Sequence, residues 1–166
     1  MYRIAVFSKH HEAGKTRLIL NLLREFPKWA VIRVEFGAVF SQVLWGDGLP
    51  PAMQARAGQL KAAGAGEVIW MCADQDDLDD TLNEALCLAG DAPGVILEGD
   101  LGLSEVDAHV WLRVEPPAKK SEKIQVWLWN LPERVKEKEK HYFLAAEGEN
   151  GAEFKDLLAQ IKRYLF

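Results

Sequence analysis

Several features that would place this chain in a specialised class of protein are missing from its sequence. It has only two cysteines among 166 residues, Cys72 and Cys87, and neither has metal-ligand spacing or belongs to a C-x-x-C pair. We expect both to be buried, unpaired thiols in a reducing compartment. The 20 lysines and arginines are outnumbered by 25 aspartates and glutamates. The resulting net charge of -5 argues against a general nucleic-acid or membrane binder, although a local basic site stays possible.

Long apolar runs are also absent. No stretch approaches the roughly 20 apolar residues that span a bilayer. The chain begins directly with the apolar segment Tyr2–Phe7, without the pattern of a signal peptide. Internal repeats, low-complexity tracts and clear linkers are absent too. We therefore expect one cytoplasmic domain over residues 1–166, long enough to bury a substantial core.

Short apolar runs alternate along the chain with helical patterns. This order predicts an α/β fold, a three-layer P-loop NTPase-like sandwich whose mostly parallel sheet of about six or seven strands carries helices on both faces. Residues 38–51 are expected to be irregular, with a turn at Gly46–Gly48. The expected strands are Tyr2–Phe7, Trp29–Phe36, Glu67–Cys72, Gly94–Leu97, His109–Val114, Lys123–Trp129 and His141–Ala146; the expected helices are Lys15–Phe26, Pro50–Ala63, Asp77–Leu88 and Glu153–Leu165.

One connection does not suit a parallel sheet. Only eight residues separate Val114 from Lys123, whereas a parallel crossover normally needs a dozen or more. The two flanking strands therefore form either an antiparallel hairpin or an unusually short crossover.

The stretch between the first strand and the first helix, Ser8–Thr16 (SKHHEAGKT), matches part of a phosphate-binding loop. Gly14, Lys15 and Thr16 fit the end of the pattern G-x-x-x-x-G-K-[ST], but Lys9 stands where the first glycine belongs. Gly14 would let the backbone approach phosphates, and Lys15 would bridge the β- and γ-phosphates. The Thr16 hydroxyl would bind Mg²⁺. The alternative is an incidental strand-to-helix turn, because the missing glycine normally makes the tight exit from the strand.

The rest of the loop supplies further candidate contacts to the nucleotide. His10 and His11 could touch phosphate or tune the loop with pH, or they are simply exposed. Adjacent histidines rarely converge on one metal ion without other ligands. The complete set of candidates here is Lys9, His10, His11, Glu12, Ala13, Gly14, Lys15, Thr16 and Arg17, of which Lys15 and Thr16 would serve catalysis.

A phosphate loop needs a second acidic group at a neighbouring strand end, to hold Mg²⁺ or its waters. Glu98 ends an apolar run and is the expected metal ligand beside Thr16; Asp100 and Glu35 are its rivals. The acidic stretch Asp74–Asp80 lacks the glycine and the distant glutamate of a calcium loop. We expect it to complement the N-terminus of a helix instead.

The strand Ile124–Trp129 is followed by Asn130-Leu131-Pro132-Glu133. This stretch resembles the Asn-Lys-x-Asp motif of GTPases, with Asn130 as the Asn and Glu133 in the place of the guanine-binding Asp. Ala145-Ala146-Glu147 resembles a degenerate copy of the Ser-Ala-Lys turn of the same proteins. The resemblance implies that Asn130 and Glu133 lie near the base.

Within the P-loop NTPase superfamily, the chain resembles the molybdopterin-guanine dinucleotide biosynthesis protein B (MobB)-like GTP-binding family. The similarity lies in the N-terminal strand–loop–helix, in Gln59–Val68 (QLKAAGAGEV) and in Val95–Gly99 (VILEG), and it extends over about Tyr2 to Val114. It implies GTP binding, weak hydrolysis and support of molybdenum-cofactor maturation. The phosphate loop of that family has the first glycine, which is absent here.

Three functions fit these observations. The first is a slow Mg²⁺-dependent NTPase that binds GTP or ATP and acts with a protein partner as an accessory factor in cofactor maturation. It would have no nucleic-acid or membrane partner, and a homodimer is one possible assembly. The second is a degenerate P-loop domain that serves as a non-catalytic interaction module, with Trp45, Trp127 and Trp129 as candidate exposed contacts. The third is a small-molecule kinase. It ranks last because it needs an acceptor site and a lid with arginines, and Ala52–Lys61 holds only Arg56.

Overall fold

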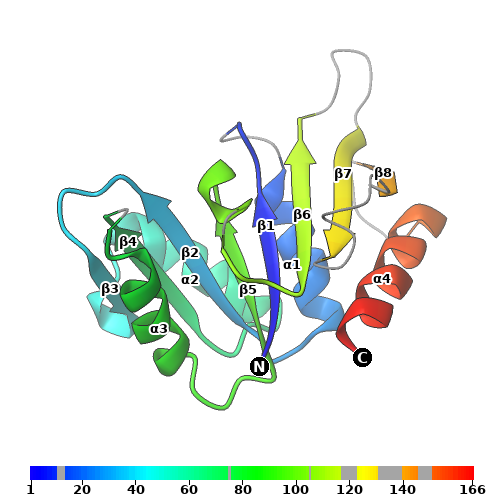
Figure 1. Cartoon of the computed structure of the whole chain (residues 1–166). Coiled ribbons are helices and arrows are strands. Elements are labelled where there is room, and N and C mark those ends of the chain that lie inside the picture. The colour runs from blue at the N-terminus through cyan, green and yellow to red at the C-terminus, as the bar shows by residue number, and fades with distance from the viewer. Residues whose placement is uncertain (11–13, 75, 105, 117–122, 131–139, 146–150) are drawn as a thin grey trace.

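The protein has an α/β fold with one mixed sheet and helices on both faces of it (Figure 1). The computed structural model describes residues 1–10, 14–74, 76–104, 106–116, 123–130, 140–145 and 151–166. Along the chain, the described elements are β1 (Tyr2–Phe7), α1 (Lys15–Glu25), β2 (Ala30–Phe36), β3 (Gln42–Trp45), η1 (Gly46–Gly48), α2 (Pro51–Ala62), β4 (Val68–Ala73), α3 (Leu78–Leu88), β5 (Gly94–Gly99), η2 (Leu101–Ser104), β6 (Val110–Glu115), β7 (Lys123–Asn130), β8 (Lys140–Ala145) and α4 (Ala152–Leu165).

The sheet is only partly the one expected. Within the described residues it has eight strands in the order β3-β4-β2-β5-β1-β6-β7-β8. Its centre, from β4 to β6, is parallel, whereas β3 and β7 run antiparallel to their neighbours. The prediction that residues 38–51 are irregular was wrong at Gln42–Trp45, which pair with Ile69–Cys72 as the edge strand β3.

The short connection after β6 joins an antiparallel pair of strands. Val110 lies opposite Asn130 and Glu115 opposite Gln125, so β6 and β7 run in opposite directions. The hairpin alternative is therefore the one that the structure adopts. Strand β8 returns antiparallel to β7 and extends the sheet on this side.

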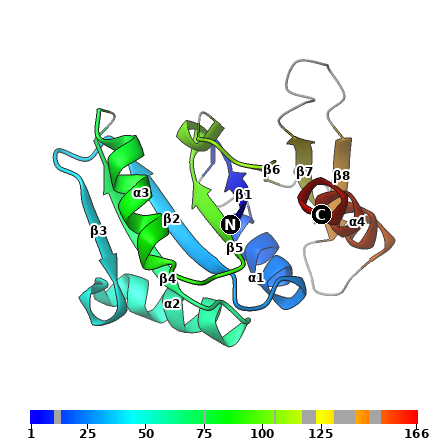
Figure 2. The ribbon, with the colours of Figure 1, turned by 60° about the horizontal axis from the view of Figure 1, so that its bottom comes forward.

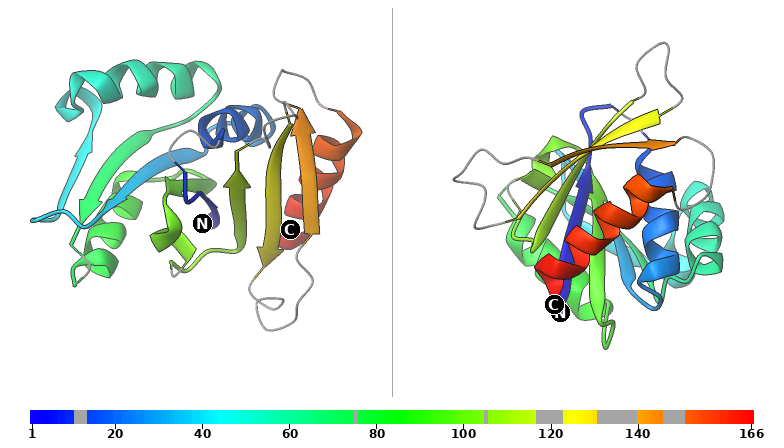
Figure 3. Two further views of the ribbon diagram at one scale, coloured as in Figure 1. Left: turned by 90° about the horizontal axis from the view of Figure 1, so that it is seen from above. Right: turned by 90° about the vertical axis from the view of Figure 1, so that its right-hand side faces the viewer.

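Two apolar clusters sandwich the sheet, one on each face. In β1, Ile4 and Val6 join one cluster while Ala5 and Phe7 join the other, because successive side chains of a strand point to opposite faces. The first cluster also contains residues of α1, α2 and α4, and the second contains residues of α3 and η2. Figures 2 and 3 show α1 and α2 together on one side of the sheet and α3 on the other. Both faces of the central strands are thus sealed, as the continuous apolar runs predict.

The order of the strands creates a crevice at their carboxyl edge. Strand β5 lies between β1 and β2, although it follows both in the sequence. The chain leaves β1 through α1 on one face of the sheet, and it leaves β5 through η2, which packs on the other face. Ligands of open α/β sheets bind where neighbouring strands lead to opposite faces in this way.

The structure also tests what was expected of the cysteines and of the tryptophans. Both cysteines are free and Cys72 is buried, but Cys87 is exposed on α3, so the prediction of two buried thiols was wrong for Cys87. Trp45 is 47% exposed on the edge strand. Trp127 is half-buried, with the Arg113 guanidinium 5.2 Å from its ring centroid.

None of the described helices combines the length and the apolar character that crossing a bilayer requires.

Candidate functional site

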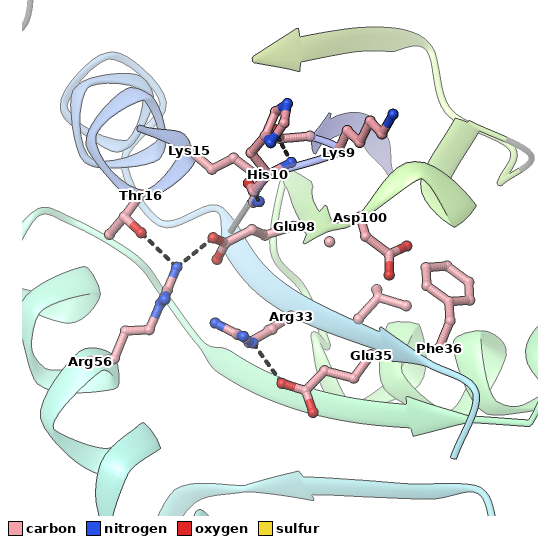
Figure 4. A pocket seen from close by; sticks show the side chains of 13 residues that line it. Lys9, His10, Lys15, Thr16, Arg33, Glu35, Phe36, Arg56, Glu98 and Asp100 are labelled. Atoms are coloured by element: carbon pink, nitrogen blue, oxygen red, sulfur yellow. Dashed lines mark hydrogen bonds and ion pairs between the residues drawn. The ribbon is translucent and has the colours of Figure 1, made fainter. Parts of the chain in front are cut away.

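A pocket of about 420 Å³ occupies the crevice at the carboxyl ends of β1, β2 and β5 (Figure 4). Four cationic side chains line it against three carboxylates, so its walls favour an anionic ligand. The residues around it are Ser8, Lys9, His10, Lys15, Thr16, Arg33, Val34, Glu35, Phe36, Arg56, Glu98, Gly99 and Asp100.

The front of the loop closes without a glycine. The buried Ser8 hydroxyl accepts a hydrogen bond of 2.9 Å from the backbone N–H of His10, a local turn of the kind that serine favours. Among the described residues other than glycines, only Lys28 has a positive φ, so Lys9 follows a backbone path open to any residue. His10 Nε2 lies 3.7 Å from a carboxylate oxygen of Glu115, an ion pair when the imidazole is protonated.

The back of the loop does require its glycine. Gly14 precedes α1 with φ of 90° and ψ of 12°, in the left-handed region, and its carbonyl accepts the first helical hydrogen bond from the N–H of Leu18 at 3.1 Å. The N-terminus of α1 has no side-chain cap and no acidic residue in its first turn. It therefore presents unsatisfied N–H groups and the positive end of the helix dipole beside the pocket.

Lys15 points back along the loop. Its Nζ donates a hydrogen bond of 3.1 Å to the carbonyl oxygen of His10. Burial lowers the pKa of Lys15 below the ordinary lysine value, and the nearby charges of Arg33 and Arg56 lower it further, against the opposing effect of Glu98 and Asp100. An anion in the pocket would offset this cost, because it favours the charged form of the lysine.

Thr16 and Glu98 are held together by an arginine from α2. One nitrogen, Nη2 of Arg56, donates to Thr16 Oγ1 at 2.7 Å and to Glu98 Oε1. The Glu98 side chain is only 3% exposed, and its second oxygen, Oε2, is buried without a hydrogen-bond partner. Figure 4 shows the guanidinium of Arg56 between the two groups.

The wall formed by β2 carries a second arginine. Arg33 Nε donates to Glu35 Oε1 at 3.0 Å, and Cys72 Sγ lies 4.0 Å from the other oxygen of Glu35. The backbone of Arg33 pairs in register with that of Glu98 on β5. Beyond the loop between β1 and α1, the pocket thus offers a further guanidinium and carboxylate.

The structure brings most of the described candidates into this one pocket. Lys9, His10, Lys15, Thr16 and Glu98 line it, as do the rival acids, Glu35 and Asp100. Gly14 lies directly before α1. Arg17 is in the first turn of α1 but does not line the pocket. The candidates His11, Glu12, Ala13 and Glu133 lie outside the described residues.

The expectation that Asn130 lies beside the nucleotide site was wrong. It assumed a strand that runs parallel to β1, but β7 is antiparallel, and Asn130 pairs with Val110 at the start of β6. Since β6 is parallel to β1 and Val110 pairs with Ile4, Asn130 lies toward the amino edge of the sheet, about 20 Å of strand length along β7 from Ile124, which packs against Gly14. The backbone of Ala145, at the end of β8, does reach the carboxyl edge, where it pairs with Lys123.

Two arginines of the pocket, Arg33 and Arg56, were not among the predicted site residues. Arg33 had a local signal, because Arg33 and Glu35 form a charged pair on one face of an otherwise apolar strand (AVIRVEF). Arg56 had no local signal, because its partners Thr16 and Glu98 lie 40 and 42 residues away from it in the sequence.

The acidic stretch flanks a helix, as expected. Asp77 directly precedes α3, and Asp79 and Asp80 lie in its first turn. Across the described ranges, no group of three or more histidine, cysteine, aspartate or glutamate side chains could hold a metal ion.

No protein-family model, curated protein or solved structure matches the chain.

Proposed function

We propose that the protein binds a nucleoside triphosphate with Mg²⁺ in this pocket and hydrolyses it slowly, as a P-loop NTPase-like domain. The observation that carries the proposal is the convergence of Lys15, Thr16 and Glu98 at the crevice between β1 and β5. The uncapped N-terminus of α1 and the cationic lining supply the two features that phosphate groups need.

Each residue has a definite part in binding. Lys15 exchanges the carbonyl of His10 for phosphate oxygens, and the N–H groups at the start of α1 donate to the same phosphates. Thr16 would hold the metal through its hydroxyl and Glu98 through its carboxylate. No general base is evident among the lining residues, which suits slow hydrolysis by positioning and charge stabilisation.

The donor set fits magnesium. Mg²⁺ prefers hard oxygen ligands, and both side chains that would hold it offer oxygen. The buried, unpartnered Oε2 of Glu98 is a free acceptor at the edge of the pocket. A bound Mg²⁺ would neutralise charge on the phosphate oxygens; the chain itself orients the phosphates through Lys15 and α1.

The resemblance to the MobB-like family supports a narrower proposal, that the protein acts with a partner as an accessory factor in maturation of a molybdopterin-type cofactor. Of the matching stretches, Val95–Gly99 forms most of β5 and ends at the pocket, whereas Gln59–Val68 joins the end of α2 to the start of β4. The misplaced Asn130 removes the support for a guanine-specific contact there, so either GTP or ATP fits the proposal.

Isothermal titration with non-hydrolysable ATP and GTP analogues, with and without Mg²⁺, tests the function. We expect micromolar binding by the native chain and its loss in Lys15→Ala. The matched control is Lys155→Ala, which removes an exposed lysine of α4 remote from the pocket and should leave binding unchanged. Failure of both analogues to bind at millimolar concentration would refute the proposal and leave a non-catalytic interaction module.

The two pocket arginines favour small-molecule kinase activity as a second candidate. Arg33 and Arg56 lie beyond the phosphate loop, where a kinase would hold an acceptor. An acceptor that Arg33 binds should increase the rate of ADP or GDP formation, and the increase should vanish in Arg33→Gln. An unchanged rate over a panel of phosphorylated and carboxylated acceptors would leave the slow NTPase.

A further inference from the structure

The Thr16–Glu98 pair already holds a cation of the protein itself. Arg56 Nη2 contacts Thr16 Oγ1 at 2.7 Å and also Glu98 Oε1. These are the hydroxyl and the carboxylate that would hold a metal ion. The guanidinium thus lies on the ligands that a divalent cation would need.

Burial explains why this carboxylate needs a cation at all times. The Glu98 side chain is 3% exposed, and a buried carboxylate is stable only when it is paired and hydrogen-bonded. In the structure, Arg56 meets that need for Oε1, while Oε2 keeps no partner. Removing Arg56 without a replacement would leave an uncompensated buried charge.

The side chain of Arg56 is also able to move away from Thr16 and Glu98. Its side chain is 23% exposed, lines the open pocket and comes from α2, separate from the loop and from β5. Its charged end contacts Thr16 and Glu98, and its Nε has no hydrogen-bond partner among the residues that the structure describes. A rotation of the flexible side chain into the pocket would release both oxygens without moving the backbone.

We propose that Arg56 is an exchangeable built-in cation, which occupies the Thr16–Glu98 pair in the metal-free protein and releases it when a divalent ion binds. The inference rests on the proposed function for the identity of the ion. Arg56 and the metal compete for one site, so the free protein binds metal weakly. Once released, the guanidinium faces the pocket, where it can pair with a phosphate oxygen.

Titration of the nucleotide-free protein with Mn²⁺, a paramagnetic substitute for Mg²⁺, measures this competition. We expect Arg56→Gln to bind Mn²⁺ at least tenfold more tightly than the native chain. The matched control is Arg33→Gln, which removes the same charge from the same pocket but whose side chain pairs with Glu35 instead of with Thr16 or Glu98. An equal gain in both variants, or no gain in Arg56→Gln, would overturn the proposal.

Thermal unfolding keeps the test decisive if Arg56→Gln is unstable. The variant should unfold at a lower temperature than the native chain without metal, and Mn²⁺ should restore most of the loss. Arg56→Gln/Glu98→Gln removes both charges, so it should be more stable than the single variant and gain nothing from Mn²⁺. A single variant that Mn²⁺ does not stabilise would contradict the exchange.

The outcomes separate the two proposals. Tighter Mn²⁺ binding by Arg56→Gln in a protein that binds no nucleotide would support the exchange and refute the nucleotide site. Nucleotide binding that depends on Lys15, together with unchanged Mn²⁺ affinity in Arg56→Gln, would refute the exchange alone.

Discussion

Gly14 lies directly against Ile124, so that the loop before α1 rests on the hairpin strand β7. A Cβ atom on Gly14 would lie 2.9 Å from Cγ2 of Ile124, and the φ of 90° is one that side-chain-bearing residues rarely adopt. We therefore predict that Gly14→Ala lowers the free energy of unfolding by about 1–2 kcal/mol from the backbone alone, and by more if Ile124 cannot move. Denaturant unfolding measures this loss.

A double-mutant cycle separates the contact from the backbone strain. In the background of Ile124→Ala the contact is gone, so Gly14→Ala should cost less there than in the native chain. The remaining cost reports the left-handed backbone. Equal costs in both backgrounds would show that Ile124 does not constrain the loop.

The burial of the Lys15 ammonium group lowers the stability of the folded state. Burial lowers its pKa, which means that the folded state disfavours the ammonium form relative to the unfolded chain. We predict that Lys15→Ala abolishes nucleotide binding while its melting temperature at pH 7 equals or exceeds that of the native chain. The advantage should shrink at alkaline pH, as the native lysine loses its proton in the folded state. A large loss of stability at pH 7 would contradict this account.

Nucleotide affinity should fall with rising pH in a range set by Lys15. Phosphate binding needs the ammonium form, and the pKa of Lys15 lies below the ordinary 10.5, first because of burial and then because of Arg33 and Arg56. The fall should therefore begin at a lower pH than for an exposed lysine. Arg33→Gln removes one of the lowering charges and should shift the fall to higher pH. Affinities measured by titration across alkaline pH test both statements, and a shift to lower pH would refute the second.

Restoring the standard glycine at position 9 should not improve the loop. Lys9 has no positive φ, and the Ser8 hydroxyl already closes the turn through the N–H of His10. Lys9→Gly should lower the free energy of unfolding by about 0.5–1 kcal/mol through backbone entropy. Nucleotide affinity should not rise relative to Lys9→Ala, the control for the lost charge. A higher affinity in Lys9→Gly than in Lys9→Ala would show that the loop needs the glycine.

The sequence predicted the elements that have a strong local pattern. Hydrophobic periodicity predicted strands such as Tyr2–Phe7 and helices such as Lys15–Glu25 to within a few residues. The rule that ligands bind at the carboxyl ends of parallel strands predicted Glu98 as a pocket residue. The edge strand Gln42–Trp45 was missed because it has four residues and takes its order from pairing with β4. Asn130 was misplaced because strand direction depends on pairing partners, which a linear pattern does not contain. Arg56 was missed as a site residue for the same reason, since its partners come from distant segments.

In the central strands β2 and β5, the first residues pack in the core and later residues line the pocket. On the face that α1 and α2 cover, β2 and β5 begin with sealed residues such as Val31 and Ile96, and one step further on the same face they carry Arg33 and Glu98. A substitution at Arg33 can therefore alter ligand preference while Val31, two residues earlier on the same face, stays packed in the core. In a fold arranged in this way, the ligand-binding residues can change during evolution while the packed core stays the same. The same few positions are where a protein engineer could introduce a new specificity.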